Sequence, residues 1–493
     1  MVDPARGGAI LGIGASSYPL LTPAPRWVEQ DPEAWWQAVI GAVRQALAQS
    51  GLRAADIDSI GLSGQMQGSV FLDAGDKVLR PALLWCDQRT GEAADDIAQS
   101  LGQALILEVT GSPVAMGSTA SKIVWFRQHE PDLYARVRWL LLPKDYIRLR
   151  LTGERATDSS DASATALLDV RRRTWSETML QALGVPRDWL PPVCASHAIA
   201  GRISAETAEI TGLAAGTPVV VGSGDDAASA VGCGAVEPGI VASSVGTSAV
   251  LLAISERVTV DPLLRVSLLC HAVPGQWQIV GATNAAGASL RWLKNTFGEA
   301  ESAAAERTGA DVYDLLCQEA AQVPPGSEGL VFLPHLMGMR SPTPDARASG
   351  AFIGITLRHT KPHFVRAVLE GVAFGIRDSL EVLKELGVPL ANIRAIGGGA
   401  RSPLWRQIQA DILGLEHVTV NVTECAAFGA ALVAGVGVGC FADLAEACRA
   451  SVRLETISSP QRQYAAVYAE NYRFYRAMTQ AAYEFNHPEL FHR

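Results

Sequence analysis

Apolar residues along the chain follow two spacings, one typical of buried strands and one typical of amphipathic helices. Short, uninterrupted apolar runs predict strands at 57–62, 218–221, 240–245, 249–254 and 393–396. Apolar residues three or four positions apart predict helices at 35–47 and 362–386. Strands that alternate with helices are typical of an α/β protein. They form two comparable blocks that meet near 239–248, and we expect ligands to bind in a cleft between such blocks.

The composition narrows the class of protein without identifying it. A chain of 493 residues, 48% hydrophobic and 18% charged, fits two or three well-filled domains. The net charge of −9 argues against a nucleic-acid partner and against an anionic membrane, since both favour basic patches. The apolar run 426–442 is rich in Ala and Gly, which predicts an interior helix rather than a membrane span.

The cysteines and the first residues point to a cytoplasmic protein. Eight cysteines are scattered without a C-x-x-C pair, which predicts free thiols in a reducing compartment. No basic segment followed by an apolar segment opens the chain, so we expect no secretory signal.

Two adjacent carboxylates, Asp225 and Asp226, follow the predicted strand at 218–221. One hypothesis is helix capping, because an Asp at the start of a helix accepts hydrogen bonds from free backbone N–H groups. The other hypothesis is chemical. A carboxylate at the carboxyl end of a strand faces the ligand crevice of an α/β sheet and can accept a proton from a substrate hydroxyl. The residues alone leave both hypotheses open.

Two glycine-containing turns are candidate anion sites. Residues 246–248 lie between two predicted strands, where backbone N–H groups and hydroxyls can form an anion nest. Residues 397–399 are three glycines between a predicted strand and a helix N-terminus, which favours negative charge. Ordinary turns remain the alternative for both, because Gly, Ser and Thr also favour turns. The second segment is not G-x-G-x-x-G, so it does not predict dinucleotide binding.

Two polar segments are candidates for binding a polyol. Met66 and Gln67 lie in a loop after the first predicted strand, where amides can hydrogen-bond hydroxyls, although a polar surface loop is the alternative. Trp85, Asp87 and Arg89 offer an aromatic wall, a carboxylate and a guanidinium, although a structural ion pair is equally compatible with these residues.

In order and spacing, these segments resemble the FGGY family of carbohydrate kinases, and within it the xylulokinases, from about residue 18 to about residue 475. The segment 117–129 fits the first family signature at every constrained position. Further matching segments are 18–23, 27–32, 61–66, 142–146, 156–158, 332–334, 370–374 and 397–401.

The resemblance implies an α/β fold of two actin-like ATPase (ribonuclease-H-like) domains with an interdomain cleft. Residues 1–240 would bind the sugar and residues 241–485 the nucleotide. It implies transfer of the γ-phosphoryl group of ATP, with Mg²⁺, to a ketopentose, most closely D-xylulose, giving D-xylulose 5-phosphate. Asp225 corresponds to the general base, and no metal ligand is assigned. The implied sugar-binding residues are Met66, Gln67, Asp226, Trp85 and Asp87, and the implied nucleotide-binding residues are Gly246, Thr247, Ser248, Gly397, Gly398, Gly399 and Ala400.

The chain also departs from the family pattern. Family members begin with a phosphate-binding hairpin, and residues 1–8 align just after it. Either the natural protein starts upstream of Met1, or the hairpin is missing and transition-state stabilisation is weaker. Gln67 stands where many xylulokinases have His, Asp226 where many have Asn, and Met339 where Glu is common. Another ketose or polyol substrate, or a catalytically impaired sugar- or nucleotide-binding protein, therefore remains an alternative. The expected partner is a small-molecule sugar, and a homodimer is compatible with the resemblance.

Overall fold

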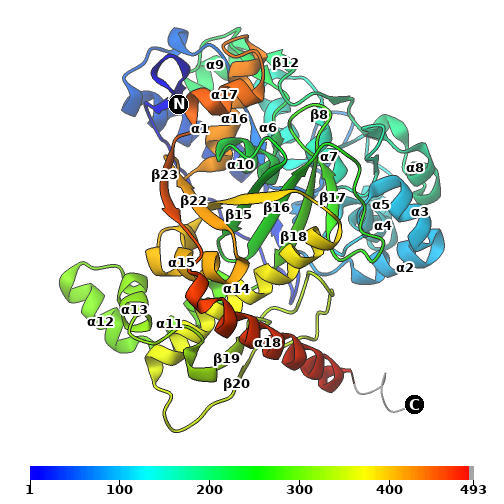
Figure 1. Ribbon diagram of the computed structural model, residues 1–493. Helices are drawn as coiled ribbons and strands as arrows, with labels where there is room; N and C mark the ends of the chain where they lie inside the picture. The colour runs from blue at the N-terminus through cyan, green and yellow to red at the C-terminus, as the bar shows by residue number, and fades with distance from the viewer. Residues whose placement is uncertain (488–493) are drawn as a thin grey trace. The chain divides into compact units, whose positions relative to one another are not determined.

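The computed structural model describes residues 1–487 (Figure 1). The chain divides into two compact units. The first unit comprises Met1–Val236, Ile254–Gln278 and Glu424–Val452, and the second comprises the remainder. The chain first passes from one unit to the other close to residue 240, but two later segments return to the first unit. The predicted domain limits, 1–240 and 241–485, stay a prediction.

The first unit forms around an apolar core to which its longest helix, α1 (Pro32–Ser50), contributes Trp35 and Trp36. Asp31 caps this helix by accepting the N–H of Glu33 at 2.9 Å, so the helix predicted at 35–47 is confirmed and extended. The other helices of the unit are α2 (Gly91–Leu101), α3 (Gln103–Thr110), α4 (Thr119–His129), α5 (Pro131–Tyr134), α6 (Pro143–Thr152), α7 (Ser159–Ser163), α8 (Glu177–Leu183), α9 (Ala205–Thr211), α10 (Asp225–Gly232), α16 (Cys425–Gly437) and α17 (Leu444–Ser451).

The strands of the first unit are short. β13 (Pro218–Val220) confirms the strand predicted at 218–221. The buried strand predicted at 57–62 is wrong: only Ile60 pairs there, with Val219, and the segment is partly exposed. Within residues 1–487 this segment pairs along one edge only, and its Gly61 packs against Ala430 of α16. The other strands are β1 (Val2–Asp3), β2 (Ala9–Ile10), β3 (Glu29–Gln30), β4 (Ser63–Gly64), β5 (Val70–Leu72), β6 (Ala82–Leu83), β7 (Trp139–Leu141), β8 (Thr157–Asp158), β9 (Leu168–Asp169), β10 (Thr174–Trp175), β11 (Val193–Cys194), β12 (Ile199–Arg202), β14 (Ser223–Gly224) and β17 (Ser267–Cys270).

The second unit is built on a mixed sheet with strands in the order β18-β16-β15-β21-β22-β23. β15 is antiparallel to β16 and parallel to β21, which is in turn parallel to β22. The strands predicted at 240–245, 249–254 and 393–396 are confirmed. The strands are β15 (Gly239–Val245), β16 (Ala249–Ser255), β18 (Trp277–Thr283), β21 (Leu390–Ile396), β22 (Glu416–Val420) and β23 (Leu454–Ser458), and a separate pair is β19 (Val331–Leu333) with β20 (Ala351–Ile353).

A long helix, α14 (Lys361–Glu385), forms the centre of the second unit and confirms the helix predicted at 362–386. Most of its residues are buried, because it packs against α13, α15 and β19 on several sides. The remaining helices are α11 (Gly287–Phe297), α12 (Glu299–Thr308), α13 (Val312–Ala320), α15 (Pro403–Leu413) and α18 (Ala465–Asn486).

Two helices of the first unit that are far apart in the sequence, α10 and α16, lie side by side (Figure 1). Glycines allow this close approach: a methyl group at Gly429 would lie 1.9 Å from the carbonyl oxygen of Ala228, and one at Gly232 would lie 1.9 Å from that of Cys425. The interior helix predicted within 426–442 is therefore confirmed, and it supports the helix that begins with Asp225.

All eight cysteines lie within the described residues and carry free thiols. Across residues 1–487, no helix combines the length and the apolar character required to cross a membrane.

Candidate functional site

The loop that carries Met66 and Gln67 lies beside Asp225 because two strand ends pair. β4 runs parallel to β14, with Gly64 opposite Gly224. Parallel strands end at the same edge, so the residues that follow each glycine leave the pair on the same side. Gly224 contacts the loop directly, since a methyl group there would lie 2.6 Å from Sδ of Met66. The structure thus brings Met66 and Gln67, which are predicted to bind the sugar, to the same strand end as Asp225, the predicted base.

Both ends of this loop rest on the start of α6. A methyl group at Gly64 would lie 3.0 Å from Cβ of Lys144, and one at Gly68 would lie 2.4 Å from Cγ of Pro143. The absence of side chains at both glycines is therefore required by packing. The loop between them is held in place at each end while Gln65, Met66 and Gln67 remain partly exposed.

Asp225 is the first residue of α10 and is partly buried. The N-cap of this helix is Gly224, so Asp225 is not its cap; Oδ1 of Asp225 accepts the N–H of Asp226 at 3.1 Å within the first turn. Burial raises the pKa of Asp225 well above its usual value, and the negative charges of Asp226 and Asp161 raise it further. A carboxylate with a raised pKa holds a proton more firmly, which suits a group that must take one from a hydroxyl.

Behind Asp225 lies a fully buried cluster of charges around the ammonium group of Lys144. Its Nζ lies 2.8 Å from Oδ1 of Asp145, 3.1 Å from Oδ1 of Asp158 and 3.0 Å from Oδ2 of Asp161. Burial alone would lower the pKa of Lys144, but the three carboxylates raise it above its usual value. Lys144 is therefore charged at neutral pH. The sequence indicated the segments 142–146 and 156–158 as family motifs but gave their side chains no role.

Arg148 ties this cluster to the strand that leads to Asp225. Its Nη2 lies 3.0 Å from Oδ1 of Asp145, and its Nη1 donates to the carbonyl oxygen of Val221 at 2.8 Å. Val221 directly follows β13. The position of the chain just before Asp225 is thus fixed by a buried guanidinium.

Gln67 is held from behind by Lys122, which sequence reasoning did not single out. Gln67 has a φ of +66°, which is uncommon for a residue other than glycine. Its carbonyl oxygen accepts hydrogen bonds from Nζ of Lys122 at 2.6 Å and from Oγ1 of Thr119 at 3.1 Å. Burial lowers the pKa of Lys122 to about 7, although the negative charge of Asp87 acts to raise it. The only signal in the sequence was that both donors lie within the matching segment 117–129.

Trp85 and Asp87 differ sharply in exposure. Trp85 is 45% exposed. Trp85 and Gln67 both lie next to Gly117: a methyl group there would lie 2.1 Å from the Trp85 carbonyl oxygen and 3.4 Å from Oε1 of Gln67. Asp87 is fully buried. Its Oδ2 accepts the N–H of Val28 at 2.6 Å and lies 2.8 Å from Nη2 of Arg89. The ion pair left open by the sequence is present, and direct contact of Asp87 with a sugar stays a prediction.

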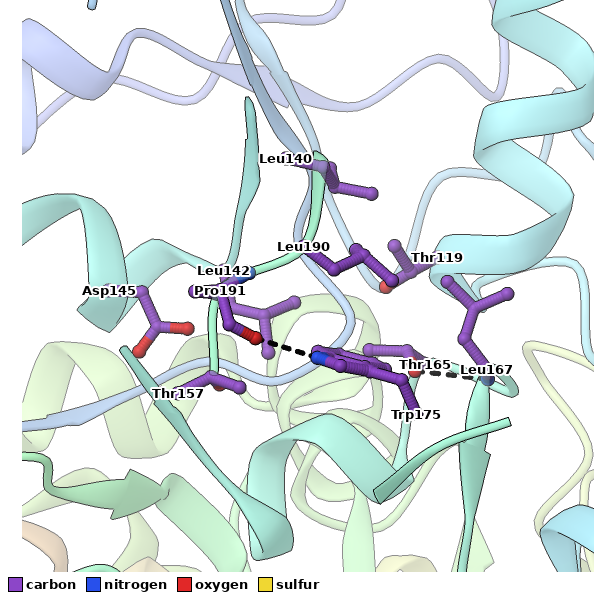
Figure 2. Close-up of a pocket in the computed structure, with 10 residues that line it drawn as sticks. All are labelled: Thr119, Leu140, Leu142, Asp145, Thr157, Thr165, Leu167, Trp175, Leu190 and Pro191. Atoms are coloured by element: carbon purple, nitrogen blue, oxygen red, sulfur yellow. Dashed lines mark hydrogen bonds between the residues drawn. The ribbon is translucent and has the colours of Figure 1, made fainter. Parts of the chain in front are cut away.

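A small cavity lies under this site, lined by the side chains in Figure 2. Asp145 and Thr157 lie on one side of it, and Trp175 lies across from them with its indole N–H donating to the carbonyl oxygen of Pro191 at 2.7 Å. Its volume of about 10 Å³ matches a single water molecule. A sugar is too large for this cavity, so the cavity is not where the substrate binds.

In the second unit, the two candidate nucleotide turns lie at the ends of neighbouring strands. β15 and β21 are parallel, with Ser244 opposite Ile396, so the turn at 246–248 and the turn at 397–400 leave the sheet at the same edge. Ligands of open α/β sheets bind at this edge. The structure thus brings the seven predicted nucleotide residues together within one unit.

The glycines of these turns fall into two kinds. A methyl group at Gly397 would lie 2.8 Å from the carbonyl oxygen of Val245, and one at Gly399 would lie 2.5 Å from Cγ1 of the same residue. Packing therefore requires both glycines. A methyl group at Gly246 or Gly398 would meet no described atom closer than 3.9 Å. Packing within the unit does not explain these two, and an unobstructed backbone there suits the close approach of a phosphate or a flat base.

Arg291 adds a positive charge to the first turn, and sequence reasoning missed it. The turn is positioned by α11: the N–H of Gly287 donates to the Gly246 carbonyl at 2.8 Å, and the N–H of Ala288 donates to the Thr247 carbonyl at 3.1 Å. One helical turn later, Nη2 of Arg291 donates to Oγ1 of Thr247 at 3.3 Å, and both side chains are exposed. An isolated Arg in a helical segment carries no sequence signal, because helices place many such residues in solvent.

Among residues 1–487, no group of three or more His, Cys, Asp or Glu side chains converges in a way that could hold a metal ion. A cation that arrives bound to nucleotide phosphates needs no such group, because Mg²⁺ keeps several waters and takes most other ligands from the phosphates.

Comparison with known proteins gives one consistent result over both units. Residues 2–232 match the N-terminal domain, and residues 241–438 the C-terminal domain, of the FGGY family of carbohydrate kinases. A xylulose kinase from Bacillus subtilis is 35% identical over 471 residues, which cover 96% of this chain and 92% of that protein. A gluconokinase from the same organism is 33% identical over 433 residues, covering 87% and 83%. A crystal structure of a "xyloylose kinase" from Brucella ovis superposes with a TM-score of 0.89 at 34% identity, covering 98% of this chain and 96% of that one.

Proposed function

Because the chain belongs to the FGGY family of carbohydrate kinases, we propose that it transfers the γ-phosphoryl group of ATP to D-xylulose, giving D-xylulose 5-phosphate. Family membership makes it a sugar kinase. The choice of D-xylulose is supported by relatives named xylulose kinase that match almost the whole chain. In this proposal the first unit binds the sugar and the second binds ATP.

The position of Asp225 carries the proposal. Its carboxylate lies at a strand end beside the Met66–Gln67 loop, and its pKa is raised by burial and by neighbouring negative charge. In the proposed step, the 5-hydroxyl oxygen of the sugar bonds to the γ-phosphorus while the bond to the bridging oxygen of ADP breaks. The hydroxyl proton passes to Asp225. Such transfers depend on positioning and charge stabilisation more than on covalent help from the protein.

The second unit offers ATP two kinds of contact. The unobstructed backbone at Gly246 and the hydroxyl of Thr247 would accept the phosphates, with Arg291 supplying positive charge. The open backbone at Gly398 would lie against the base. Mg²⁺ enters with ATP as part of the substrate, and it neutralises charge on the phosphates when bound.

The charge around Asp225 favours a neutral ketose over gluconate. Asp225 and Asp226 are adjacent, and Asp161 lies close enough to act on the pKa of Asp225. A sugar acid would bring a further carboxylate to this acidic surface, and like charges repel in partly buried sites. The gluconokinase relative nonetheless makes gluconate the competitor to test.

A coupled assay of ADP release over D-xylulose, D-ribulose, gluconate, xylitol and glycerol tests the proposal, with MgATP in excess. We expect the highest kcat/KM for D-xylulose and at least tenfold less for gluconate, a difference of about 1.4 kcal/mol. A higher value for gluconate would reassign the substrate. Calorimetric binding of D-xylulose without turnover would support the catalytically impaired alternative instead.

A further inference from the structure

A second carboxylate, Asp161, lies directly behind the catalytic position. We infer that Asp161 is a positioning residue that sets the pH range in which Asp225 can accept the sugar's proton. This inference rests on the function proposed above and adds a residue to it.

The backbone geometry places Asp161 next to Asp225. A methyl group at Gly224, the residue before Asp225, would lie 3.5 Å from Cα of Asp161. The N–H of Gly224 donates to Oγ of Ser160 at 3.1 Å. α7, which carries both of these residues, therefore touches the chain one residue ahead of the proposed base, and this contact brings Asp161 close to Asp225.

The charges of the buried cluster do not balance. Three carboxylates, on Asp145, Asp158 and Asp161, face two cations, Lys144 and Arg148. Oδ2 of Asp161 faces Lys144, but its Oδ1 is buried and accepts no hydrogen bond from residues 1–487. When all three carboxylates are ionised, a net negative charge remains behind Asp225, where water cannot screen it.

Among the described elements that pack against α10, the cation is Arg449 on α17, which is next in sequence to Cys448. On α10 itself the neighbour is Asp226, and on α7 it is Asp161. From α16, Cys425 touches Gly232, and from α17, Sγ of Cys448 donates to the carbonyl oxygen of Val231. These contacts are at the other end of α10. Among the charges acting on Asp225, Asp226 and Asp161 both raise its pKa.

Asp161 itself changes charge in the range where an enzyme works. Burial raises the pKa of Asp161 to about 7. The positive charge of Lys144 acts to lower this pKa, and the negative charges of Asp145 and Asp158 act to raise it. Above that pH Asp161 is negative and makes Asp225 harder to ionise. As the pH falls, Asp225 becomes protonated and can no longer accept a proton, so kcat/KM must fall on the acid side.

The test is the pH dependence of kcat/KM for D-xylulose in the full chain, in wild type, Asp161→Asn and Asp145→Asn. Asp145 is the matched control, because it belongs to the same buried cluster but is not among the charges that act on Asp225. We expect the acid limb of Asp161→Asn to move to lower pH by about one unit. That of Asp145→Asn should not move to lower pH, because loss of the Asp145 charge leaves Asp161 more readily ionised. A purely structural role would lower the rate without moving the limb.

Several outcomes would overturn the inference. One is an acid limb in Asp161→Asn at the wild-type pH, and another is an equal shift in both variants. A wild-type acid limb near the ordinary carboxyl pKa of about 4 would also overturn the inference. This outcome can be read from wild type alone, so it applies even if Asp161→Asn and the smaller Asp161→Ser both fail to fold. Failure of the proposed function is distinguishable, because wild type would then turn over no D-xylulose at any pH, and both proposals would fall together.

Discussion

The candidate sugar site of the first unit and the candidate nucleotide site of the second unit are stabilised by different kinds of interaction. In the first unit, the surroundings of Asp225 are fixed by buried charged side chains centred on Lys144. In the second unit, the two turns are fixed by backbone hydrogen bonds and by glycines that leave no room for a methyl group. Proton transfer needs a group of tuned charge, whereas phosphate binding needs N–H groups at close range. The difference therefore predicts that the site in the first unit loses function when charge is changed, and the site in the second unit when side-chain volume is added.

The largest effect is expected at Asp225. Asp225→Ala removes the proposed proton acceptor, and kcat should fall by about 10²–10⁴-fold. D-xylulose binding, measured by calorimetry, should change little. The exposed carboxylate of Asp96, changed to Ala, serves as the control for charge removal at a distance. Near-normal turnover in Asp225→Ala would remove Asp225 from its proposed role.

The next effect is on stability, at Lys144. Lys144→Met leaves three buried carboxylates without their ammonium partner, and the free energy of unfolding should fall by about 3–5 kcal/mol. Urea unfolding at pH 7 measures it. Lys384→Met is the control, because Lys384 is exposed and its ion pair with Glu381 is worth about 0–1 kcal/mol. If the free energy of unfolding fell equally in the two variants, the buried cluster would contribute no more to stability than an exposed ion pair.

In the second unit, the corresponding test adds volume. Gly399→Ala places a methyl group 2.5 Å from Cγ1 of Val245, which forces the turn to shift. Such overpacking costs about 1–3 kcal/mol of unfolding free energy, measured by urea unfolding. The KM for ATP should rise as well, because the turn moves. A variant as stable as wild type would mean that the turn yields easily.

Gly246→Ala separates ligand contact from packing. The added methyl group meets no described atom closer than 3.9 Å, so stability should change by less than about 0.5 kcal/mol. The KM for ATP should still rise about tenfold, equivalent to about 1.4 kcal/mol, because the methyl group occupies the approach of a phosphate. An unchanged KM would indicate that nucleotide does not contact this turn, and the KM for D-xylulose is the internal reference.

Elements with a clear period could be predicted from the sequence, and contacts between distant segments could not. α1, α14, β15 and β21 follow directly from apolar spacing. The strand expected at 57–62 failed because apolar content does not reveal whether a partner strand is present on each side.

The candidate site divides in the same way. Asp225, Gly246 and Gly398 stand at strand ends, where local sequence already indicates their use. Lys122, Asp161 and Arg291 acquire their roles only through the partners that the fold brings to them, namely the Gln67 carbonyl, the backbone at Gly224 and the Thr247 hydroxyl. No local pattern marks such residues, because the same side chains occur throughout helices and loops.

The clamped loop between Gly64 and Gly68 has a practical consequence for engineering sugar preference. Randomising Gln65 and Met66, with position 67 limited to residues that tolerate its φ of +66°, should yield libraries that remain largely folded, because these side chains are partly exposed. Any library that extends to either glycine will be dominated by unfolded chains, since Pro143 and Lys144 occupy the space that a new side chain would need. Selectivity in this scaffold can therefore be evolved through a three-residue window whose two borders must stay fixed.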